Sequence, residues 1–368
     1  MADTGALSRG AFYMDHESCI ERIEGGIFRA ASGSGLLMIR GACIREISGG
    51  TFQSLTDAVN QPFCHHALFI LAGSDGFRTG VKTISGGTFE SAGRTDAAAL
   101  CAYCNAQGEV YIGEITGTAC FSGSSGLLVG STHSQGKARI ERIDGGTFLS
   151  DCAATATAES ALLVSTGVVE NITAGTFLGN GTAPAIGLSR YCETDTGEMG
   201  EGGRIQEISG GDMIASGTAP ALYCAAQGSG VTLISGGFFY GDSAVLIDND
   251  EDLVITGGVF YATDRVCIQI AKGRSARLYL EPQYTTFSAS PSAKGRARYM
   301  VRNYLTEGVE NKYLFEADKE EQIVFPIWGQ IDGDKEVKPY DLSGQGVALE
   351  EGNALVADSM FRYLTPSP

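Results

Sequence analysis

Apolar and polar positions along this chain follow a pattern that returns with paired glycines at the same place in each copy. The clearest copies, residues 47–52 and 84–89, both read Ile-Ser-Gly-Gly-Thr-Phe. Near copies occupy residues 23–28, 143–148, 172–177, 208–213, 234–239 and 255–260, and a degraded copy occupies residues 115–121. A repeat spaced in this way predicts a stack of similar structural units.

An apolar residue stands three positions before almost every copy, and Asp252 replaces it before the last one. A spacing of three suits a helix face, but each interior glycine costs a helix about 1 kcal/mol, and β-branched residues favour extended chain. Residues three apart in a strand point to opposite faces, so both reach one core only if the chain bends between them. We therefore predict strand, bend, strand, glycine turn and strand. The upstream residues are Ile20, Ile44, Val81, Ile112, Ile140, Val169, Ile205 and Val231.

A second apolar run precedes most copies, so each coil of the chain offers about three short strands. The average period is roughly 29 residues, within the range of solenoids. Stacked coils would lie about 4.8 Å apart, with isoleucines and phenylalanines in interior ladders. The glycines would form a row at a corner that needs positive φ or has no room for a Cβ. The runs are residues 36–39, 67–70, 99–102, 127–129, 161–164, 221–224 and 244–247.

These observations predict an all-β fold, a right-handed single-stranded parallel β-helix of about nine coils. Over about residues 8–288 the chain resembles the pectin-lyase-like β-helix superfamily, and also the Gly-Gly-Thr-Phe repeat regions of large bacterial surface proteins. The resemblance implies the fold more than the function, because this scaffold carries lyases, hydrolases, adhesins and phage tailspikes.

The repeat divides the chain into three parts: an N-terminal cap at residues 1–18, a repeat domain at 19–290 and a C-terminal part at 291–368. The last part lacks the repeat, and we expect a β-rich cap or accessory module there, with strands at 312–315 and 322–328. The polar, glycine-rich residues 130–137 and 189–203 are expected to form surface loops.

The formal net charge of −17 disfavours nucleic acid and anionic membrane surfaces as partners. No stretch is long and apolar enough for a membrane helix, so no membrane insertion is expected. The first five residues do not resemble a signal peptide. Retention in the cytoplasm, another export route and trimming of the chain all stay open, and we favour cell surface, secreted or virion locations.

The ten cysteines are expected to be reduced and to serve mainly as small buried hydrophobic residues. The aligned repeats place Cys101 beside Phe69 and Leu128 rather than beside another cysteine. Cys101 and Cys104 form a Cys-x-x-Cys pair, but no second pair or histidine follows at zinc spacing.

Catalytic motifs are scarce. The four histidines are His16, His65, His66 and His133, and the Gly-His-Gly, Asn-Thr-Asp and Arg-Ile-Lys elements of the polygalacturonase branch are absent. No arginine and aspartate set recurs at one ladder position, as a pectate lyase would require. We assign no catalytic residue, no cofactor and no metal ligand.

Three weaker candidates have a structural interpretation beside the functional one. The run Asp248-Asn249-Asp250-Glu251-Asp252 is similar to the start of a calcium loop, but it lacks the glycine and the later glutamate of an EF-hand, which favours a solvated turn between coils. The pair His65-His66 could supply metal ligands, although on a strand one should point inward and the other outward. Tyr240 and Tyr261 are expected to point outward, either as a ladder that stacks on sugars or as ordinary surface residues.

The sequence therefore favours a non-catalytic structural or adhesive protein, such as a bacterial surface protein or a phage or secreted fibre component. It would present loops to a glycan or protein ligand and could form a homo-oligomer. The alternative is a polysaccharide lyase or glycoside hydrolase, with paired carboxylates or a carboxylate and an arginine in one groove. An intracellular assembly protein is the third hypothesis.

Overall fold

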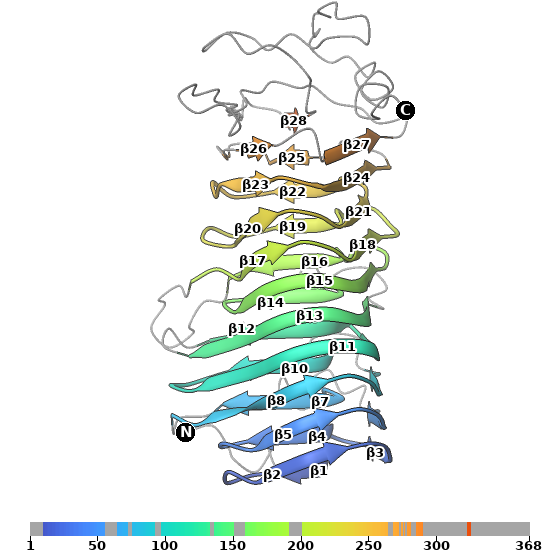
Figure 1. Cartoon of the computed structure of the whole chain (residues 1–368), viewed down its shortest axis with the longest axis vertical. Helices are drawn as coiled ribbons and strands as arrows, with labels where there is room; N and C mark the ends of the chain where they lie inside the picture. The colour runs from blue at the N-terminus through green and yellow to red at the C-terminus, as the bar shows by residue number, and fades with distance from the viewer. Residues whose placement is uncertain are drawn as a thin grey trace, which may run out of the picture.

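The chain folds into stacked β-strands, which form a tall rod in Figure 1. The computed structural model describes residues 10–55, 65–72, 76–92, 97–132, 136–150, 159–190, 201–263, 268–271, 274, 276, 278–280, 285–289 and 322–324. No helix occurs among these residues. The all-β prediction is confirmed, and the stacked parallel strands are consistent with a parallel β-helix.

The apolar runs that precede the repeats form one 11-stranded sheet, which extends along the length of the rod. Each strand pairs in parallel with the equivalent strand of the next coil, and only the pair β25–β28 is antiparallel in the described part of the sheet. Its strands, in spatial order, are β1 (Gly10–Met14), β4 (Ser34–Ile39), β7 (Leu68–Ala72), β10 (Ala98–Cys104), β12 (Ser125–Ser131), β14 (Leu162–Ser165), β16 (Ile186–Ser189), β19 (Leu222–Cys224), β22 (Val245–Ile247), β25 (Ile268–Ile270) and β28 (Gln322–Val324).

The repeats themselves build the other walls of the rod, again with parallel pairing from coil to coil. The isoleucine strands are β2 (Cys19–Ile23), β5 (Cys43–Ile47), β8 (Arg78–Ile84), β11 (Glu109–Gly123), β13 (Lys137–Ser150), β15 (Val168–Gly179), β17 (Arg204–Ile208), β20 (Gly230–Ile234), β23 (Leu253–Ile255) and β26 (Leu278–Leu280). The phenylalanine strands are β3 (Ile27–Ala30), β6 (Thr51–Ser54), β9 (Thr88–Ser91), β18 (Asp212–Ala215), β21 (Phe238–Gly241), β24 (Gly258–Ala262) and β27 (Thr285–Ala289), while β11, β13 and β15 carry both segments.

Phenylalanine rings stack along the interior of the rod. From Phe28 to Phe177, and again from Phe239 to Phe260, consecutive ring centroids lie 4.7 to 4.9 Å apart and the rings are within 11° of parallel. Met213 occupies the same position between these two series. The spacing matches the distance between neighbouring strands, so the predicted phenylalanine ladder is confirmed.

The predicted bend between the two apolar positions of each repeat lies inside a single strand. Ile44 and Ile47 are both buried in β5 although they are three residues apart. Ile44 and Glu46 pair in register with residues of β2 and β8, whereas the exposed Arg45 between them has no partner in either pairing. The chain therefore bends without ending the strand, whereas the sequence predicts two strands separated by a bend.

The two glycines of a repeat meet different requirements at the corner between the isoleucine and phenylalanine segments. A Cβ on Gly86 would lie 2.4 Å from the carbonyl oxygen of Ser48 in the preceding coil, which leaves no room for a side chain. Gly87 has a φ of 105°, a conformation that residues with a Cβ rarely adopt. Both predicted reasons for glycine at the corner are thus present.

The described residues cover little of the predicted terminal parts. Residues 1–9 and most of 291–368 lie outside them, as do residues 133–135 and 191–200 in the predicted loops. Within the C-terminal part, β28 begins at Gln322, where the sequence predicts a strand, and pairs with β25. The domain boundaries themselves stay predictions.

Candidate functional site

Five outward-facing apolar side chains form a continuous line on one flank of the rod, which we call the flank column. Each stands directly after the buried phenylalanine, or Met213, of its coil, and each pairs in register with the next. All five are half-buried, as expected of side chains that cover one another on an open sheet face. The flank column consists of Leu149, Leu178, Ile214, Tyr240 and Tyr261.

The same position is polar in the N-terminal coils. Arg29 donates from Nε to Oε1 of Gln53 at 2.7 Å, and Gln53 donates from Nε2 to Oε2 of Glu90 at 2.5 Å. Ser122 follows and pairs with Leu149, where the flank column begins. The flank is therefore polar over one half of the rod and apolar over the other.

The aromatic end of the flank column is a stacked pair. The rings of Tyr240 and Tyr261 lie 5.3 Å apart between centroids and within 10° of parallel. The two tyrosines therefore stack on each other, while binding of a sugar stays one of the two interpretations that the sequence left open. Phe238 lies beside Tyr240, with centroids 6.3 Å apart, and the neighbouring Val259 is 41% exposed. Because each tyrosine covers a face of the other, a sugar ring would find fewer free ring faces here than on two separate tyrosines.

The acidic run at residues 248–252 is tied into the turns around it. Asp248 accepts a hydrogen bond from Arg274 Nε at 2.9 Å and another from the hydroxyl of Tyr223. The amide of buried Asn249 donates to the carbonyl oxygens of Ala226 and Ser229. Through these contacts Asp248 and Asn249 hold neighbouring coils together. They therefore favour a structural turn over a calcium-binding loop.

The next two carboxylates of this run, Asp250 and Glu251, have partners as well. Asp250 accepts a hydrogen bond from Gln227 Nε2 at 2.7 Å, and Glu251 accepts one from the backbone N–H of Gly228 at 3.1 Å. Arg204 lies 3.4 Å from Glu251. In the described part of the chain, no three His, Cys, Asp or Glu side chains converge in a way that could hold a metal.

His65 and His66 are both buried, whereas the sequence predicts that one of them points outward. The ring of His66 packs against Phe69, and its Nδ1 lies 3.2 Å from the carbonyl oxygen of Ala98. Burial lowers the pKa of His66 to about 4, although the hydrogen bond to Ala98 opposes this shift. His66 is therefore a neutral core residue at physiological pH.

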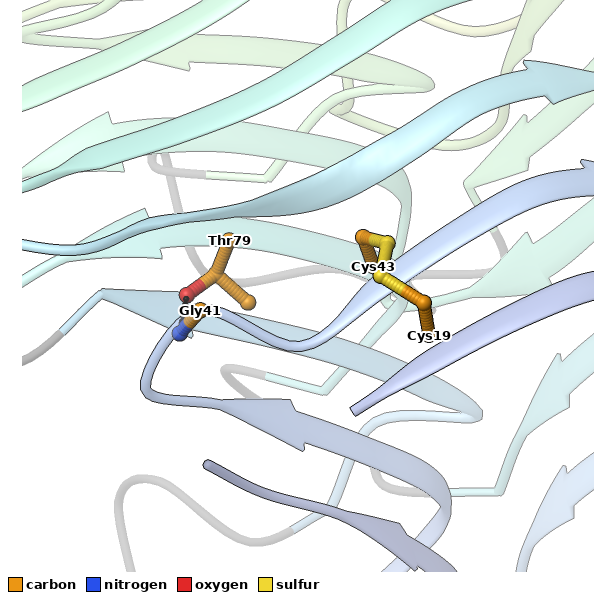
Figure 2. Close-up of a disulfide and its surroundings, with 4 residues drawn as sticks. All are labelled: Cys19, Gly41, Cys43 and Thr79. Atoms are coloured by element: carbon orange, nitrogen blue, oxygen red, sulfur yellow. Dashed lines mark hydrogen bonds between the residues drawn. A yellow bond between two sulfur atoms is a disulfide. The ribbon is translucent and has the colours of Figure 1, made fainter. Parts of the chain in front are cut away.

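The expectation that the cysteines are reduced is wrong for Cys19 and Cys43, which form a disulfide (Figure 2). They are direct partners on the neighbouring strands β2 and β5, with Cα atoms 4.7 Å apart, a distance that a disulfide can bridge. On the chain just before Cys43, Gly41 donates from its backbone N–H to Oγ1 of Thr79 at 3.0 Å. The sequence contained the signal, because the two cysteines precede the aligned residues Ile20 and Ile44.

The expectation holds for other cysteines. Cys101, Cys104 and Cys224 are buried thiols outside any disulfide, and Cys101 pairs with Phe69 and Leu128, as the aligned repeats predict. Burial raises the pKa of the Cys101 thiol, and it raises that of Cys224 to about 12. Such thiols are unreactive at neutral pH because the thiolate is the nucleophile.

A polar cluster that the sequence did not reveal joins the first two coils. Asp15 accepts hydrogen bonds from Arg40 Nε at 2.7 Å, from the Tyr13 hydroxyl at 2.8 Å and from the backbone N–H of His16 at 2.7 Å. Burial opposes ionisation, but the hydrogen bonds from Arg40 and Tyr13 hold the pKa of Asp15 below its ordinary value. A carboxylate with three donors is a structural anchor and a poor general base.

Other arginines and carboxylates form ion pairs that connect coils along the outside of the rod. The pairs join Arg22 to Glu46 at 3.3 Å, Arg78 to Glu109 at 3.4 Å, Arg142 to Glu114 at 3.0 Å and Arg139 to Glu170 at 3.0 Å. Each pair spans neighbouring coils, and Arg22, Glu46, Glu114 and Arg142 share one row of the isoleucine strands, so these charges hold coil to coil along one face of the rod.

Comparisons with protein-family models, with curated proteins and with solved structures found no match. Among the described residues no helix could cross a membrane, since none of them is helical. The function must therefore be argued from the chain's own geometry.

Proposed function

We propose that this chain is a non-catalytic structural or adhesive rod that presents its flank and loops to a glycan or protein partner. The observation that carries the proposal is the use of charged side chains. The arginine–carboxylate pairs described above bridge coils, and the carboxylates of Asp15 and Asp248 anchor turns. Glycoside hydrolysis or elimination would instead need such groups to face one substrate groove.

We infer a more specific architecture than stacked parallel strands. It is a right-handed parallel β-helix of about nine coils with a small β-rich C-terminal cap, similar to the pectin-lyase-like superfamily and to the Gly-Gly-Thr-Phe regions of bacterial surface proteins. The interior phenylalanine stack and the corner glycines support it. A core that is continuous from coil to coil resists bending, which suits a spacer or fibre component.

A location at the cell surface, in a secreted fibre or in a virion fits this role. The disulfide between Cys19 and Cys43 supports such a location, because structural disulfides persist mainly in oxidising compartments. A cytoplasmic assembly protein would keep these two thiols reduced, and mass spectrometry of the protein from its native source would show which form exists.

Activity screening tests the proposal most directly. The purified chain would be incubated with uronic-acid and neutral polysaccharides, and new reducing ends and unsaturated uronic-acid ends would be measured. We expect no turnover above a heat-denatured control, and binding without turnover in a glycan array would support adhesion. Turnover that a single Asp→Asn or Glu→Gln change abolishes would overturn the proposal in favour of a lyase or hydrolase.

A further inference from the structure

Asn180 and Gly181 form a chemically labile pair in the exposed turn between β15 and β16. The sequence contains no other asparagine that is followed by glycine. Asn180, Gly181 and Thr182 are all exposed, and the backbone N–H of Ala183 donates to the carbonyl oxygen of Asn180 at 3.1 Å, which closes the turn. Gly181 has a φ of 66°, a conformation that glycine adopts without strain. No side chain at position 181 therefore shields the carboxamide of Asn180 from the next backbone nitrogen or from water.

The next coil supplies a hydrogen-bond donor to this carboxamide. Residues 216–220 repeat the sequence of the turn at residues 180–184, with serine in place of asparagine. The hydroxyl of Ser216 lies 3.0 Å from Oδ1 of Asn180 and 3.3 Å from the carbonyl oxygen of Gly179, so the shorter hydrogen bond goes to the carboxamide. A donor at a carbonyl oxygen stabilises the negative charge that develops there when a nucleophile attacks the carbon.

We infer that Asn180 is a site of spontaneous modification, at which the backbone nitrogen of Gly181 displaces ammonia and leaves aspartate or isoaspartate. The nitrogen bonds to Cγ of Asn180 and gives up its proton, the bond from Cγ to Nδ2 breaks, and Nδ2 leaves as ammonia. Water then opens the resulting succinimide ring at either of its two carbonyl carbons. One opening gives aspartate and the other gives isoaspartate, and water is the sole co-reactant. The attack is intramolecular, which removes the entropy cost of bringing the two groups together.

Other described asparagines lack these features and serve as comparisons within the same molecule. Asn171 lies inside β15 and is followed by Ile172, whose branched side chain crowds the backbone. Asn249 is buried, and its amide group donates to two backbone carbonyl oxygens. Asn105 is exposed but is followed by Ala106. Exposure alone therefore does not distinguish Asn180, whereas exposure together with the following glycine and the hydroxyl donor does.

Conversion would change a close contact between two coils. The backbone N–H of Thr218 donates to the carbonyl oxygen of Gly181 at 3.0 Å, and a Cβ on Gly217 would lie 1.8 Å from the same oxygen. Isoaspartate adds a methylene group to the main chain at this contact, whereas aspartate keeps the backbone and adds a negative charge. We therefore expect isoaspartate to speed hydrogen exchange in residues 180–184 and 216–220 more than aspartate does.

Incubation of the purified chain at neutral pH in water enriched in heavy oxygen tests the inference. Opening of the succinimide by water incorporates heavy oxygen, so peptide mass spectrometry separates new conversion from conversion that preceded the incubation. We expect labelled aspartate and isoaspartate at position 180, at a rate that rises with pH because the attacking nitrogen must lose its proton. Peptides that contain Asn105 or Asn249 should keep their amides over the same period.

Substitutions on the two turns test the contribution of Ser216. Ser216→Ala should slow conversion about two- to tenfold, the range expected from one neutral hydrogen bond. Thr218→Ala, on the same turn, is the matched control and should leave the rate unchanged, and Asn180→Ser, which copies the next coil, should abolish the signal. Melting curves show that each variant is folded. An Asn180 that converts no faster than Asn105, or a Ser216→Ala variant that converts as fast as wild type, would overturn the inference.

Discussion

A Cβ placed on Gly49 would lie 2.3 Å from the carbonyl oxygen of Glu24 in the preceding coil. The equivalent glycine of the first described repeat, Gly25, has no atom within 4 Å of such a Cβ. The same sequence position is therefore closed by the preceding coil at Gly49 and open at Gly25, where the described residues place no repeat before it. Alanine substitutions at Gly49 and Gly25 can therefore test how closely successive coils approach each other.

We predict that Gly49→Ala destabilises the protein by about 2 kcal/mol or more, because the backbone of two coils must separate to admit the methyl group. Gly25→Ala should have an effect within about 0.5 kcal/mol, as for other open surface sites. Denaturant unfolding of both variants measures the difference. Equal losses from the two substitutions would show that the coils do not approach each other as described.

The phenylalanine ladder predicts a second contrast. Phe89 is fully buried between the rings of Phe52 and Phe121, so Phe89→Ala should cost about 3–5 kcal/mol through the cavity that it leaves. Glu90, the next residue, is exposed, and Glu90→Ala should be nearly neutral. Equilibrium unfolding in urea measures both, and a similar loss from both variants would refute the ladder.

The disulfide should stabilise the N-terminal coils in particular. Its cysteines are 24 residues apart in sequence, and closing a loop of this length contributes about 3 kcal/mol. Replacing Cys19 and Cys43 by serine should speed hydrogen exchange in residues 10–55 while later coils keep their protection, because each coil contacts mainly its neighbours. A reductant should reproduce this effect in wild type and add nothing in the variant. Unchanged exchange in residues 10–55 would contradict a stabilising role.

His66 predicts a pH dependence. Its folded pKa of about 4 lies below the ordinary value of 6.5, so the unfolded chain binds a proton that the folded chain does not bind between these values. Its contribution to stability is fully present above pH 6.5 and is lost as the pH falls towards 4, at up to about 1.4 kcal/mol per pH unit.

Unfolding free energies at pH 7 and pH 5 measure this dependence. His66→Gln should reduce the loss between the two pH values, whereas His16→Gln, at an exposed histidine, should leave the loss close to that of wild type. An unchanged pH dependence in His66→Gln would show that His66 is not buried as a neutral ring.

The repeat was enough to predict the interior of the rod, because the buried side chains and the corner glycines recur at fixed positions in each copy. Ladder positions such as Phe89 and the partners of Cys101 follow from aligning the copies, since stacked coils place aligned residues side by side. The disulfide between Cys19 and Cys43 escaped prediction because the general preference of thiols for buried, reduced positions does not say which cysteines are neighbours. Their shared place in the alignment was the relevant signal.

The outer surface was harder to predict, because residues that face outward need not be of the same type in successive copies. Leu149, Leu178 and Ile214 look like ordinary apolar residues in sequence, and only register shows that they continue the line of Tyr240 and Tyr261. The cluster around Asp15 lies before the first repeat copy, where no alignment indicates that Arg40 is its partner. Contacts between non-repeated segments depend on three-dimensional proximity that spacing does not encode.

Cross-linking across coils tests the central claim, which is that aligned residues of successive repeats lie side by side. Thr51 and Thr88 are direct partners on β6 and β9, as Cys19 and Cys43 are on β2 and β5. Thr51→Cys with Thr88→Cys should therefore form an intrachain disulfide on oxidation, detected by peptide mass spectrometry in a Cys120→Ser background, since Cys120 is the partner of residue 88 in the next coil. Thr51→Cys with Glu90→Cys shifts the pair by two residues, to a Cα separation of about 8 Å, too far for a disulfide. A disulfide in the shifted pair and none in the aligned pair would contradict the account.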